Sequence, residues 1–569
     1  MVSARVRPPD TVTARRQLAC LWTAVALVAG NGYALAQAES AATGARLSVL
    51  VETFAQAQES APPPEAREIR TLGYHTSGEG GGACYARLPH DETDIRLWQL
   101  ECSDGSRWQL AEVEVTPLMF GARPLAAGAT DDRAAFQAAF DCAADLRRGV
   151  YVPPGRYWIS GTIVIRPKPS PEIPPTGGEY QYQKPGPTYR FDRQAMLRAM
   201  PHFRGEAMIA LGDPVARGDA SWEAIHRNST LFGGVFDCNG EADVGIWITF
   251  CNDLRIYEAE VRNFRLHGFR AGSTHAAQRS YGAMFVGCKT TRDLVEAPAG
   301  SAGIYFRNCG DSHALNCTIC GVEVGVGGDD VWDSKFTNCH VWNSTTHGDL
   351  LYGFDVNGDN VLSGCQVDGP FRYAYRFRNL RNSLEACNVN YESTYGGKPD
   401  HATVIRIEPG GGVTAMNCNW KATSADPTVP VAKLKAEVEG DTSRFRSKGN
   451  KRLNVDRYEI SRGPDELCLA GRVPGAAVDG PVSFGAVRVV NIGALERRGP
   501  GVYEITANNP LPADGPLLVT VCSAAGDEPL VATEDTEGRT HYSVRIVFHN
   551  LRGERKDPKA FSVAMYGAG

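Results

Sequence analysis

Six cysteines recur at the same position of a short repeated segment, and this repeat constrains the fold more than any other feature of the chain. They begin segments such as Cys339-His340-Val341-Trp342 and Cys365-Gln366-Val367-Asp368, and successive cysteines lie 29, 22, 26, 22 and 31 residues apart. A base period near 22 residues, interrupted by insertions, is typical of a β-solenoid, in which each repeat forms one coil. The six are Cys288, Cys317, Cys339, Cys365, Cys387 and Cys418.

A second apolar segment follows in each repeat, for example Gly303-Ile304-Tyr305-Phe306 and Gly353-Phe354-Asp355-Val356. In a strand, alternate side chains point to opposite faces, so one column faces the interior and the next faces outward. Small polarizable thiols pack well at a repeated inward position. The spacing Cys317-x-x-Cys320 is also compatible with a metal site, but alternation directs Cys317 inward and Cys320 outward. We therefore predict that the cysteines form a structural ladder.

The N-terminus has the order of a secretory signal peptide. Arg15 and Arg16 precede an apolar run from Leu18 to Gly30, and Ala34-Leu35-Ala36 is a small-x-small cleavage signature. The run is too short to span a bilayer comfortably, and no other uninterrupted run approaches that length. We expect a secreted or periplasmic protein without a membrane span, after cleavage near Ala36.

Charge and composition restrict the partners. The 569 residues are 43% hydrophobic, which is enough apolar surface for an ordered globular protein. Without residues 1–36, which hold four Arg and one Asp, 55 basic and 64 acidic residues remain, and the net charge changes from −6 to −9. This acidity argues against a nucleic-acid partner.

A capping helix is predicted ahead of the repeats. Thr130 or Asp131 would cap a helix that runs to about Leu146, and its apolar stripe would be Ala135, Phe136, Ala139, Phe140 and Ala143. Asp131 and Asp132 look like a catalytic pair, but carboxylates also suit a helix start. We interpret them as caps.

The residues around this helix carry a family resemblance. Phe120-Gly121-Ala122, Thr130-Asp131-Asp132, Ala135-Phe136-Gln137-Ala138-Ala139 and Val152-Pro153-Pro154-Gly155-Arg156-Tyr157 resemble the pectate-lyase-3 type domain, also called rhamnogalacturonase/epimerase-like. This family occurs in secreted polysaccharide-active proteins and phage tailspikes. The chain departs from the family pattern at Leu125-Ala126-Ala127-Gly128-Ala129, where Asp-Gly is usual. The resemblance implies a right-handed parallel β-helix, and it does not specify one reaction.

The predicted fold is therefore all-β: a right-handed parallel β-helix with an N-terminal capping helix and a C-terminal β-sandwich-like domain. We assign residues 1–36 to the signal peptide, 37–113 to a linker and small β module, 114–428 to the β-helix and 429–569 to the last domain. In the small module, Cys84 and Cys102 either form a disulfide or stay as buried thiols. The last domain loosely resembles tailspike modules that bind glycans or trimerise, which implies a possible homotrimer.

The outward columns are the candidate binding surface. Aromatic rings stack on sugars and guanidinium groups bind carboxylates, so these columns suggest a groove for an anionic polysaccharide. A solvated sheet with cross-strand pairs, such as Asp355 with Arg376, is the alternative. The candidates in the second segments are Trp247, Arg270, Tyr305, Asp355, Arg376 and Arg406, beside Arg307 and Arg378, with gaps at Gly325 and Gly327. His340, Trp342 and Asp368 lie on the first segments.

Glycoside hydrolysis usually requires two carboxylates across the scissile bond. Asp355, Asp368 and Asp349 are the preferred candidates, and Asp329 and Asp330 come next, in an expected turn between coils. A lyase would instead need a base such as Arg, Lys or Tyr near a neutralised uronate. A carboxylate hydrolase requires no metal, whereas Ca²⁺ is common in pectate lyases.

The function predicted from the sequence is processing of an extracellular, acidic polysaccharide by hydrolysis or elimination. The alternative is a non-catalytic protein that binds glycans or builds a surface structure with the same groove. A carboxylate pair facing one cleft would favour the enzyme, and carboxylates scattered around the cylinder would favour binding or structure.

Overall fold

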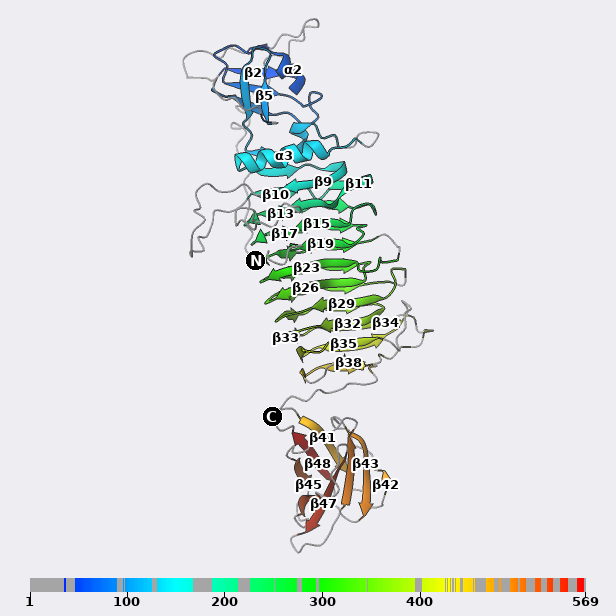
Figure 1. The fold of residues 1–569 in the computed structure, drawn as a ribbon. Coiled ribbons are helices and arrows are strands. Elements are labelled where there is room, and N and C mark those ends of the chain that lie inside the picture. The colour runs from blue at the N-terminus through cyan, green and yellow to red at the C-terminus, as the bar shows by residue number, and fades with distance from the viewer. Residues whose placement is uncertain are drawn as a thin grey trace, which may run out of the picture.

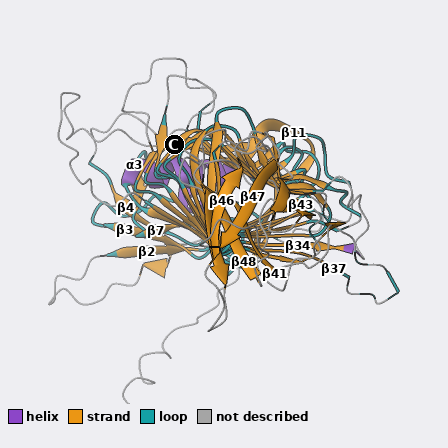
Figure 2. Ribbon diagram, turned by 90° about the horizontal axis from the view of Figure 1, so that it is seen from below, coloured by secondary structure: helices purple, strands orange, loops and turns teal. Residues whose placement is uncertain are grey.

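The cysteine repeats form stacked parallel strands in the computed structural model of the chain (Figure 1). The structure describes residues 35–36, residues 47–453 with gaps, Val455 and the C-terminal strands given below. The gaps are 90–95, 97, 125–129, 167–186, 213–225, 250, 274–278, 293–295, 345, 394–401, 425, 427, 430, 432–433, 435 and 441–443. Almost all the regular structure is strand, as Figure 2 shows, so the predicted all-β class is confirmed.

Each coil of the right-handed parallel β-helix has three strands, which stack into three faces. The first face holds the cysteine-led segments: β14 (Val235–Asp237), β18 (Glu260–Arg262), β22 (Lys289–Thr291), β25 (Thr318–Cys320), β28 (His340–Trp342), β31 (Gln366–Asp368), β34 (Asn388–Glu392), β37 (Asn419–Thr423) and β40 (Lys451–Leu453). The second face holds β15 (Val244–Ile248), β19 (His267–Ala271), β23 (Ala302–Gly310), β26 (Val324–Trp332), β29 (Leu350–Val356), β32 (Phe371–Phe377), β35 (Thr403–Ile407) and β38 (Ala436–Gly440).

The third face was not predicted from the sequence. Its strands precede the cysteines: β7 (Glu114–Val115), β8 (Gly149–Val152), β10 (Thr188–Phe191), β13 (Thr230–Phe232), β17 (Arg255–Tyr257), β21 (Met284–Val286), β24 (His313–Leu315), β27 (Lys335–Thr337), β30 (Val361–Ser363), β33 (Leu380–Glu385), β36 (Gly411–Met416) and β39 (Phe445–Lys448). Long strands β9 (Gly155–Ile165) and β11 (Ala195–Leu211) continue from the first face into the second. Short strands β12 (His226–Arg227), β16 (Cys251–Asn252) and β20 (Ser280–Tyr281) lie at the corner between the second and third faces.

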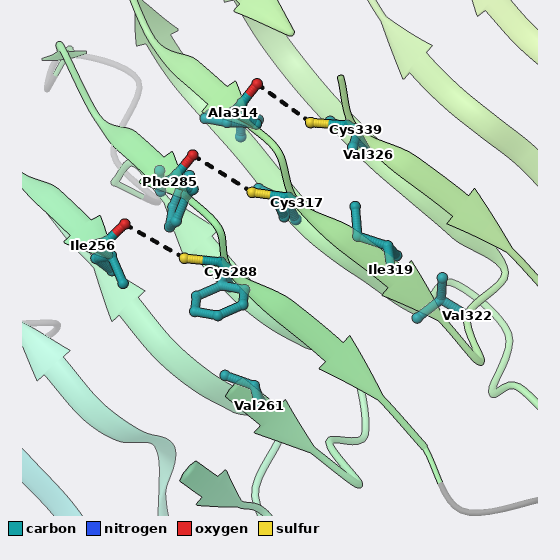
Figure 3. Packing of buried hydrophobic residues seen from close by; sticks show 14 of the residues in the cluster. Ile256, Val261, Phe285, Cys288, Ala314, Cys317, Ile319, Val322, Val326 and Cys339 are labelled. Carbon is teal, nitrogen blue, oxygen red and sulfur yellow. Dashed lines mark hydrogen bonds between the residues drawn. The ribbon is translucent and has the colours of Figure 1, made fainter. Parts of the chain in front are cut away.

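The cysteine ladder is confirmed as part of the core. All six ladder thiols are buried, and each approaches a backbone carbonyl of the preceding coil. The sulfur of Cys288 lies 3.4 Å from the oxygen of Ile256, and Cys317 and Cys339 repeat the contact at 3.5 and 3.3 Å with Phe285 and Ala314 (Figure 3). The thiols therefore donate hydrogen bonds at the corner where the third face meets the first.

Cys320 points outward from its strand, as predicted, but it is not exposed to solvent. It lies on the outward side of β25 but is buried, because the imidazole Nδ1 of His347 covers its sulfur at 3.8 Å. Burial raises the pKa of the Cys320 thiol to about 12. Among the described residues, no three His, Cys, Asp or Glu side chains are arranged to hold a metal ion.

Helix α3 (Arg133–Leu146) covers the N-terminal end of the β-helix (Figure 1). Its N-cap is Asp132, one residue after the expected position, and the Asp132 carboxylate accepts hydrogen bonds from the backbone of Arg123 and Trp158 rather than from the helix. Asp131 accepts from the N–H of Arg133 at 3.0 Å. Both carboxylates are thus structural, as predicted.

The β-helix continues past the predicted boundary at residue 428. Strands β38, β39 and β40 add a further coil that ends at Leu453. Asn450 takes the place of the ladder cysteine there, and its side chain accepts a hydrogen bond from the N–H of Cys418 at 2.9 Å. Because the marker residue changes, the cysteine repeat did not reveal this coil.

The N-terminal module is a mixed sheet in the order β1 (Leu35–Ala36), β2 (Ser48–Val51), β3 (Glu68–Thr71), β4 (Cys84–Arg87), β6 (Arg107–Leu110) and β5 (Gln99–Glu101). Strand β2 and helix α2 (Phe54–Glu59) lie within the segment predicted to contain a linker as well as the small β module. Of the predicted signal peptide, only β1 belongs to the described residues, so cleavage near Ala36 stays a prediction.

The disulfide considered between Cys84 and Cys102 does not form, since both are free thiols. Cys84 lies on β4 and Cys102 directly follows β5, and β6 lies between these strands. Two strand spacings are roughly 9.6 Å, which is more than a disulfide can bridge. Of the two alternatives considered for Cys84 and Cys102, the one with two free thiols is therefore correct.

The C-terminal region contains two antiparallel sheets, as predicted for a β-sandwich-like domain. One has the order β41 (Leu467–Pro474), β48 (Ala560–Tyr566) and β45 (Leu517–Cys522). The other has the order β42 (Gly480–Pro481), β43 (Ile492–Gly499), β44 (Val502–Ala507), β47 (Ser543–Asn550) and β46 (Leu530–Asp535). In the described part of the chain, no helix is both long and apolar enough to cross a membrane.

Candidate functional site

The outward column that the sequence predicted for the second segments lies on the second face, with one change of register. Tyr305 pairs with Gly327, Gly327 with Asp355, and Asp355 with Arg376. The sequence had placed Gly325 at this position. Gly325 instead lies beside the core, where an added Cβ would meet the side chain of Val341 at 2.3 Å.

This two-residue shift changes the position of Asp329. The sequence placed it in a turn between coils, but it lies within β26 and pairs with Arg307 on β23. Asp329 therefore faces outward in the column next to Asp355. Gly327 leaves no side chain between Tyr305 and Asp355 in the first column.

Five side chains on these strands form one bonded group, which we call the Asp355 cluster: Tyr305, Asp329, Asp355, Arg376 and Arg378. Arg378 bridges both carboxylates, with Nη1 2.9 Å from Asp329 Oδ1 and Nε 3.0 Å from Asp355 Oδ1. The hydroxyl of Tyr305 donates to Asp329 Oδ2 at 2.7 Å. Arg376 Nη1 lies 3.5 Å from Asp355 Oδ2. The two carboxylates thus share a single guanidinium group.

The environments of the two carboxylates shift their pKa values in opposite directions. Asp355 is 8% exposed, and burial raises its pKa although Arg378 and Arg376 oppose the shift. Partial burial of Asp329 would raise its pKa too, but hydrogen bonds from Tyr305 and Arg378 outweigh burial and lower the pKa. Opposite shifts in neighbouring carboxylates are the arrangement that separates a catalytic acid from a base or nucleophile.

Aromatic and charged side chains extend the cluster along the face. Tyr352 and Tyr373 stack with ring centroids 5.7 Å apart, and the Arg376 guanidinium lies 4.7 Å from the Tyr352 centroid. Glu408 accepts from Arg376 at 3.1 Å, and the Arg406 guanidinium pairs with Glu408 and Glu439. The two tyrosines were not predicted from the sequence, because each lies one residue before a segment of the repeat, residues 353–356 or 374–377. Alternation does not reveal them either, because two residues before Asp355 is Gly353, and Tyr373 alternates with the buried Tyr375.

On the other side of Gly327, His267 stacks on Tyr305 with centroids 4.4 Å apart and an interplanar angle of 9°. Burial lowers the pKa of His267 to about 3, so the imidazole is neutral in the folded protein near neutral pH. Its Nδ1 is buried without a hydrogen-bond partner among the described residues. His267 is therefore a packing support for Tyr305.

Trp247 and Arg270 do not offer a binding surface, contrary to the prediction. The Trp247 ring is 1% exposed, and its indole N–H donates to the carbonyl of Gly272. Arg270 is also buried, lies 4.3 Å from the Trp247 centroid and pairs with Glu206 at 2.7 Å. Arg270 thus stacks on Trp247 and pairs with Glu206, and both Trp247 and Arg270 are removed from solvent.

Three predicted residues lie on the first face, away from the Asp355 cluster. His340 Nε2 lies 2.9 Å from Asp368 Oδ2, and Gln366 donates to the same oxygen at 2.6 Å. Trp342 is beside Asp368 in the register. Asp368 and Asp355 belong to different faces, so they do not form one carboxylate pair.

The remaining candidates lie at the edges of the site. Asp330 is exposed, with a positive φ of 57°, where β26 bends out of the second face. Asp349 is exposed in the loop before β29. Of the carboxylates selected from the sequence, only Asp329 and Asp355 are joined.

Comparisons with known proteins found solved structures with distant similarity to this chain. No protein-family model matches the chain, and no curated protein is similar to it. A solved structure described as Geobacillus virus E2 ORF18 is 11% identical with a TM-score of 0.46, over 89% of this chain and 90% of that one. Full-length tailspike protein 2 from Escherichia coli O157:H7 bacteriophage CAB120 is 10% identical with a TM-score of 0.44, over 91% and 77%.

A third solved structure is tailspike protein gp49 from Acinetobacter baumannii bacteriophage Fri1, described as a capsular polysaccharide depolymerase. It is 12% identical with a TM-score of 0.39, over 91% of this chain and 98% of that one. Identities and scores of this size carry no conclusion about chemistry. The assignment of the fold rests on the strand register, and the function has to be argued from the site.

Proposed function

We propose that the chain is a polysaccharide-processing enzyme that hydrolyses glycosidic bonds at the Asp355 cluster. The observation that carries the proposal is the joined pair of Asp329 and Asp355, whose pKa values are shifted in opposite directions. Hydrolysis of a glycosidic bond requires one protonated carboxyl group and one carboxylate. The cluster supplies both from neighbouring strands.

In this proposal Asp355 is the general acid and Asp329 is the base or nucleophile. Burial keeps the Asp355 proton bound at a pH where Asp329, which accepts from Tyr305 and Arg378, is ionised. Arg378 holds both groups in place and stabilises negative charge on either one. Gly327 has no side chain of its own beside Asp355, and the proposal places the sugar at this position, between Tyr305 and Arg376.

The pairing of the arginines favours hydrolysis over elimination. A lyase requires a base and a cation that neutralises the uronate. Arg376, Arg378 and Arg406 already pair with carboxylates. Burial and the hydrogen bond to Asp329 raise the Tyr305 pKa, so this phenol stays protonated near neutral pH and does not supply the base.

The same pairing weakens the prediction of an acidic substrate, since that prediction depended on free guanidinium groups. We propose that neutral glycans be tested alongside acidic ones. Action outside the cell, a homotrimeric assembly and a reaction that requires no metal, with Ca²⁺ as the open alternative, stay predictions that accompany this proposal.

The decisive experiment incubates the purified full-length protein with a panel of neutral and acidic polysaccharides. New reducing ends without ultraviolet absorbance indicate hydrolysis, and absorbance from an unsaturated uronate indicates a lyase. Asp355→Asn should lower kcat/KM by about 10²- to 10⁴-fold, the usual contribution of a general acid. Asp329→Asn should have an effect of the same order.

Asp333→Asn is the matched control, because Asp333 is exposed on the same coil and its positive φ of 50° is one that Asn tolerates. It should retain full activity. Equal activity of Asp355→Asn and Asp333→Asn would show that the cluster is not the catalytic site.

A non-catalytic glycan-binding protein is the second candidate, and the stacked pair Tyr352 and Tyr373 favours it. Aromatic rings flanked by arginine bind sugar faces without any reaction. This function predicts binding to a polysaccharide that persists in Asp355→Asn but is weakened in Tyr352→Ala, with no product formed by the wild-type protein.

A further inference from the structure

A pocket on another side of the molecule combines charged side chains that lack partners with an aromatic wall. It lies at the corner between the second and third faces and has a volume of about 240 Å³. We call it the corner pocket, and it is lined by Asn252, Asp253, Arg255, Tyr281, Gly282, Met284, Asp311 and His313. It shares no residue with the Asp355 cluster.

Three consecutive coils build the pocket, and the middle coil contributes Gly282. The turns after β16, after β20 and before β24 place Asp253, Gly282 and Asp311 at equivalent left-handed positions, with φ of 58°, 65° and 50°. An added Cβ on Gly282 would meet Asp253 Oδ1 at 2.6 Å. Because Gly282 has no side chain, the Asp253 carboxylate lies in the place that a Cβ would take, and the backbones of Asp253 and Asp311 are two strand spacings, roughly 9.6 Å, apart along the stack.

The floor and wall of the pocket are less polar. Met284 lies between Arg255 and His313 in the register of the third face, and Tyr281 is half-buried on β20. The Tyr281 ring meets the Trp332 ring edge-on at 6.3 Å. Trp332 packs over Gly310, where an added Cβ would lie 2.5 Å from its Nε1.

The charged groups of the pocket differ from those of the Asp355 cluster in having no partner. Within the described residues, Asp253, Arg255 and Asp311 form no side-chain hydrogen bond or ion pair, and each is exposed. Burial and Lys335 lower the pKa of His313, so its imidazole is neutral at neutral pH and can donate or accept. The pocket therefore presents the carboxylates of Asp253 and Asp311 as acceptors and the guanidinium group of Arg255 as a donor. The neutral imidazole of His313 adds one donor and one acceptor nitrogen.

We infer that the corner pocket is a binding site for a single neutral sugar ring. Carboxylates accept from neighbouring hydroxyl groups, a guanidinium donates to hydroxyl oxygens, and Met284 and Tyr281 contact the apolar side of the ring. The volume is below the usual range for drug-sized ligands, which suits one ring of a chain. This inference does not require the Asp355 cluster to be catalytic, and it adds a second contact point for a glycan on coils that overlap in part with those of the cluster.

The test uses the full-length protein and three probes: the methyl α-glycosides of glucose, mannose and galactose. Binding is followed by saturation-transfer NMR and by titration calorimetry. We expect at least one glycoside to bind with a dissociation constant in the millimolar range, as is usual for a contact of about −4 kcal/mol.

Gly282→Asp is the informative variant. It puts a side chain where the Asp253 carboxylate now lies, so this carboxylate has to leave its place in the pocket. We expect binding to weaken at least tenfold. Gly105→Asp is the matched control, because Gly105 also has a positive φ, 77°, and its added Cβ would meet nothing within 4 Å. It should bind as the wild-type protein does.

Three outcomes would overturn the inference. They are no binding of any glycoside by the wild-type protein, binding that Gly282→Asp leaves unchanged, and binding of CaCl₂ alone in a way that Gly282→Asp abolishes. Asp355→Asn should leave glycoside binding at the pocket intact. Failure at the pocket and failure of the proposed catalytic function are thus separate results.

Discussion

The Asp355 cluster and the corner pocket lie on different faces of the β-helix, on coils that overlap in part, and their charged side chains differ in having partners. In the cluster, Arg378 joins Asp329 to Asp355 at 2.9 and 3.0 Å, and each charge has a partner. In the pocket, Asp253, Arg255 and Asp311 converge without bonds to one another. A paired set is preorganised and holds its pKa shifts, whereas an unpaired set leaves its donors and acceptors available to a ligand.

The difference comes from strand register. On the second face, arginine and carboxylate residues follow one another in neighbouring strands, at a spacing where cross-strand pairs form. At the corner, Gly282 separates Asp253 from Asp311, and Met284 separates Arg255 from His313. The neutral middle coil keeps the charges apart.

The largest expected effect tests whether pairing matters for stability. Arg378→Met leaves the buried Asp355 with one partner fewer and should lower the free energy of unfolding by about 2 kcal/mol, less than for a fully buried pair because Arg378 is partly exposed. Arg255→Met removes an unpaired, exposed charge, and its effect should stay within about 0.5 kcal/mol. Urea unfolding followed by circular dichroism measures both. Equal losses of unfolding free energy in Arg378→Met and Arg255→Met would show that pairing of the charges makes no difference to stability.

A pH series gives the next effect. An unfolded His267 takes up a proton below its ordinary pKa of 6.5, while the folded ring stays neutral until about pH 3. Falling pH therefore stabilises the unfolded state, and stability is lost from about pH 6.5 downward. His267→Phe keeps the stack on Tyr305 without this proton. Between pH 7 and 5 the variant should gain about 2 kcal/mol relative to wild type.

His313→Phe in the corner pocket is the comparison for that series. Burial also lowers the His313 pKa, but this ring is closer to solvent, so the relative gain at pH 5 should be smaller. Thermal unfolding at matched pH values is the measurement. A larger gain for His313→Phe would mean that the pocket, not the second face, holds the more buried imidazole.

The smallest effect concerns the core that both surfaces share. Cys317 is inward on the coil that carries Asp311 and His313 to the pocket and Asp329 to the cluster. Cys317→Ala should cost about 1 to 2 kcal/mol through a lost thiol contact and a small cavity. Cys84→Ala, at a half-buried position of the N-terminal module, should cost less. A reducing agent should change neither value, since both thiols are free.

Strand alternation and the cysteine ladder were predictable from the sequence, because both are local patterns with period two and a recurring residue. The register error at Gly325 arose in Gly325-Val326-Gly327-Gly328, where few side chains distinguish the inward from the outward positions. Trp247 was assigned to the correct column but the wrong environment, because exposure depends on Arg270 in the next coil. The corner pocket was not predicted at all, since its residues come from three coils and only the stacking of these coils brings them together.

By itself, the sequence determined the coil, its inward thiols and most of the outward columns, because neighbouring residues in a strand decide which way each side chain points. Only the tertiary structure decided which charges are neutralised. Arg378 and Asp329 are 49 residues apart in the chain, and their bond depends on how the coils stack. The sequence therefore named both carboxylates of the cluster, but the stacking showed that they share one guanidinium group.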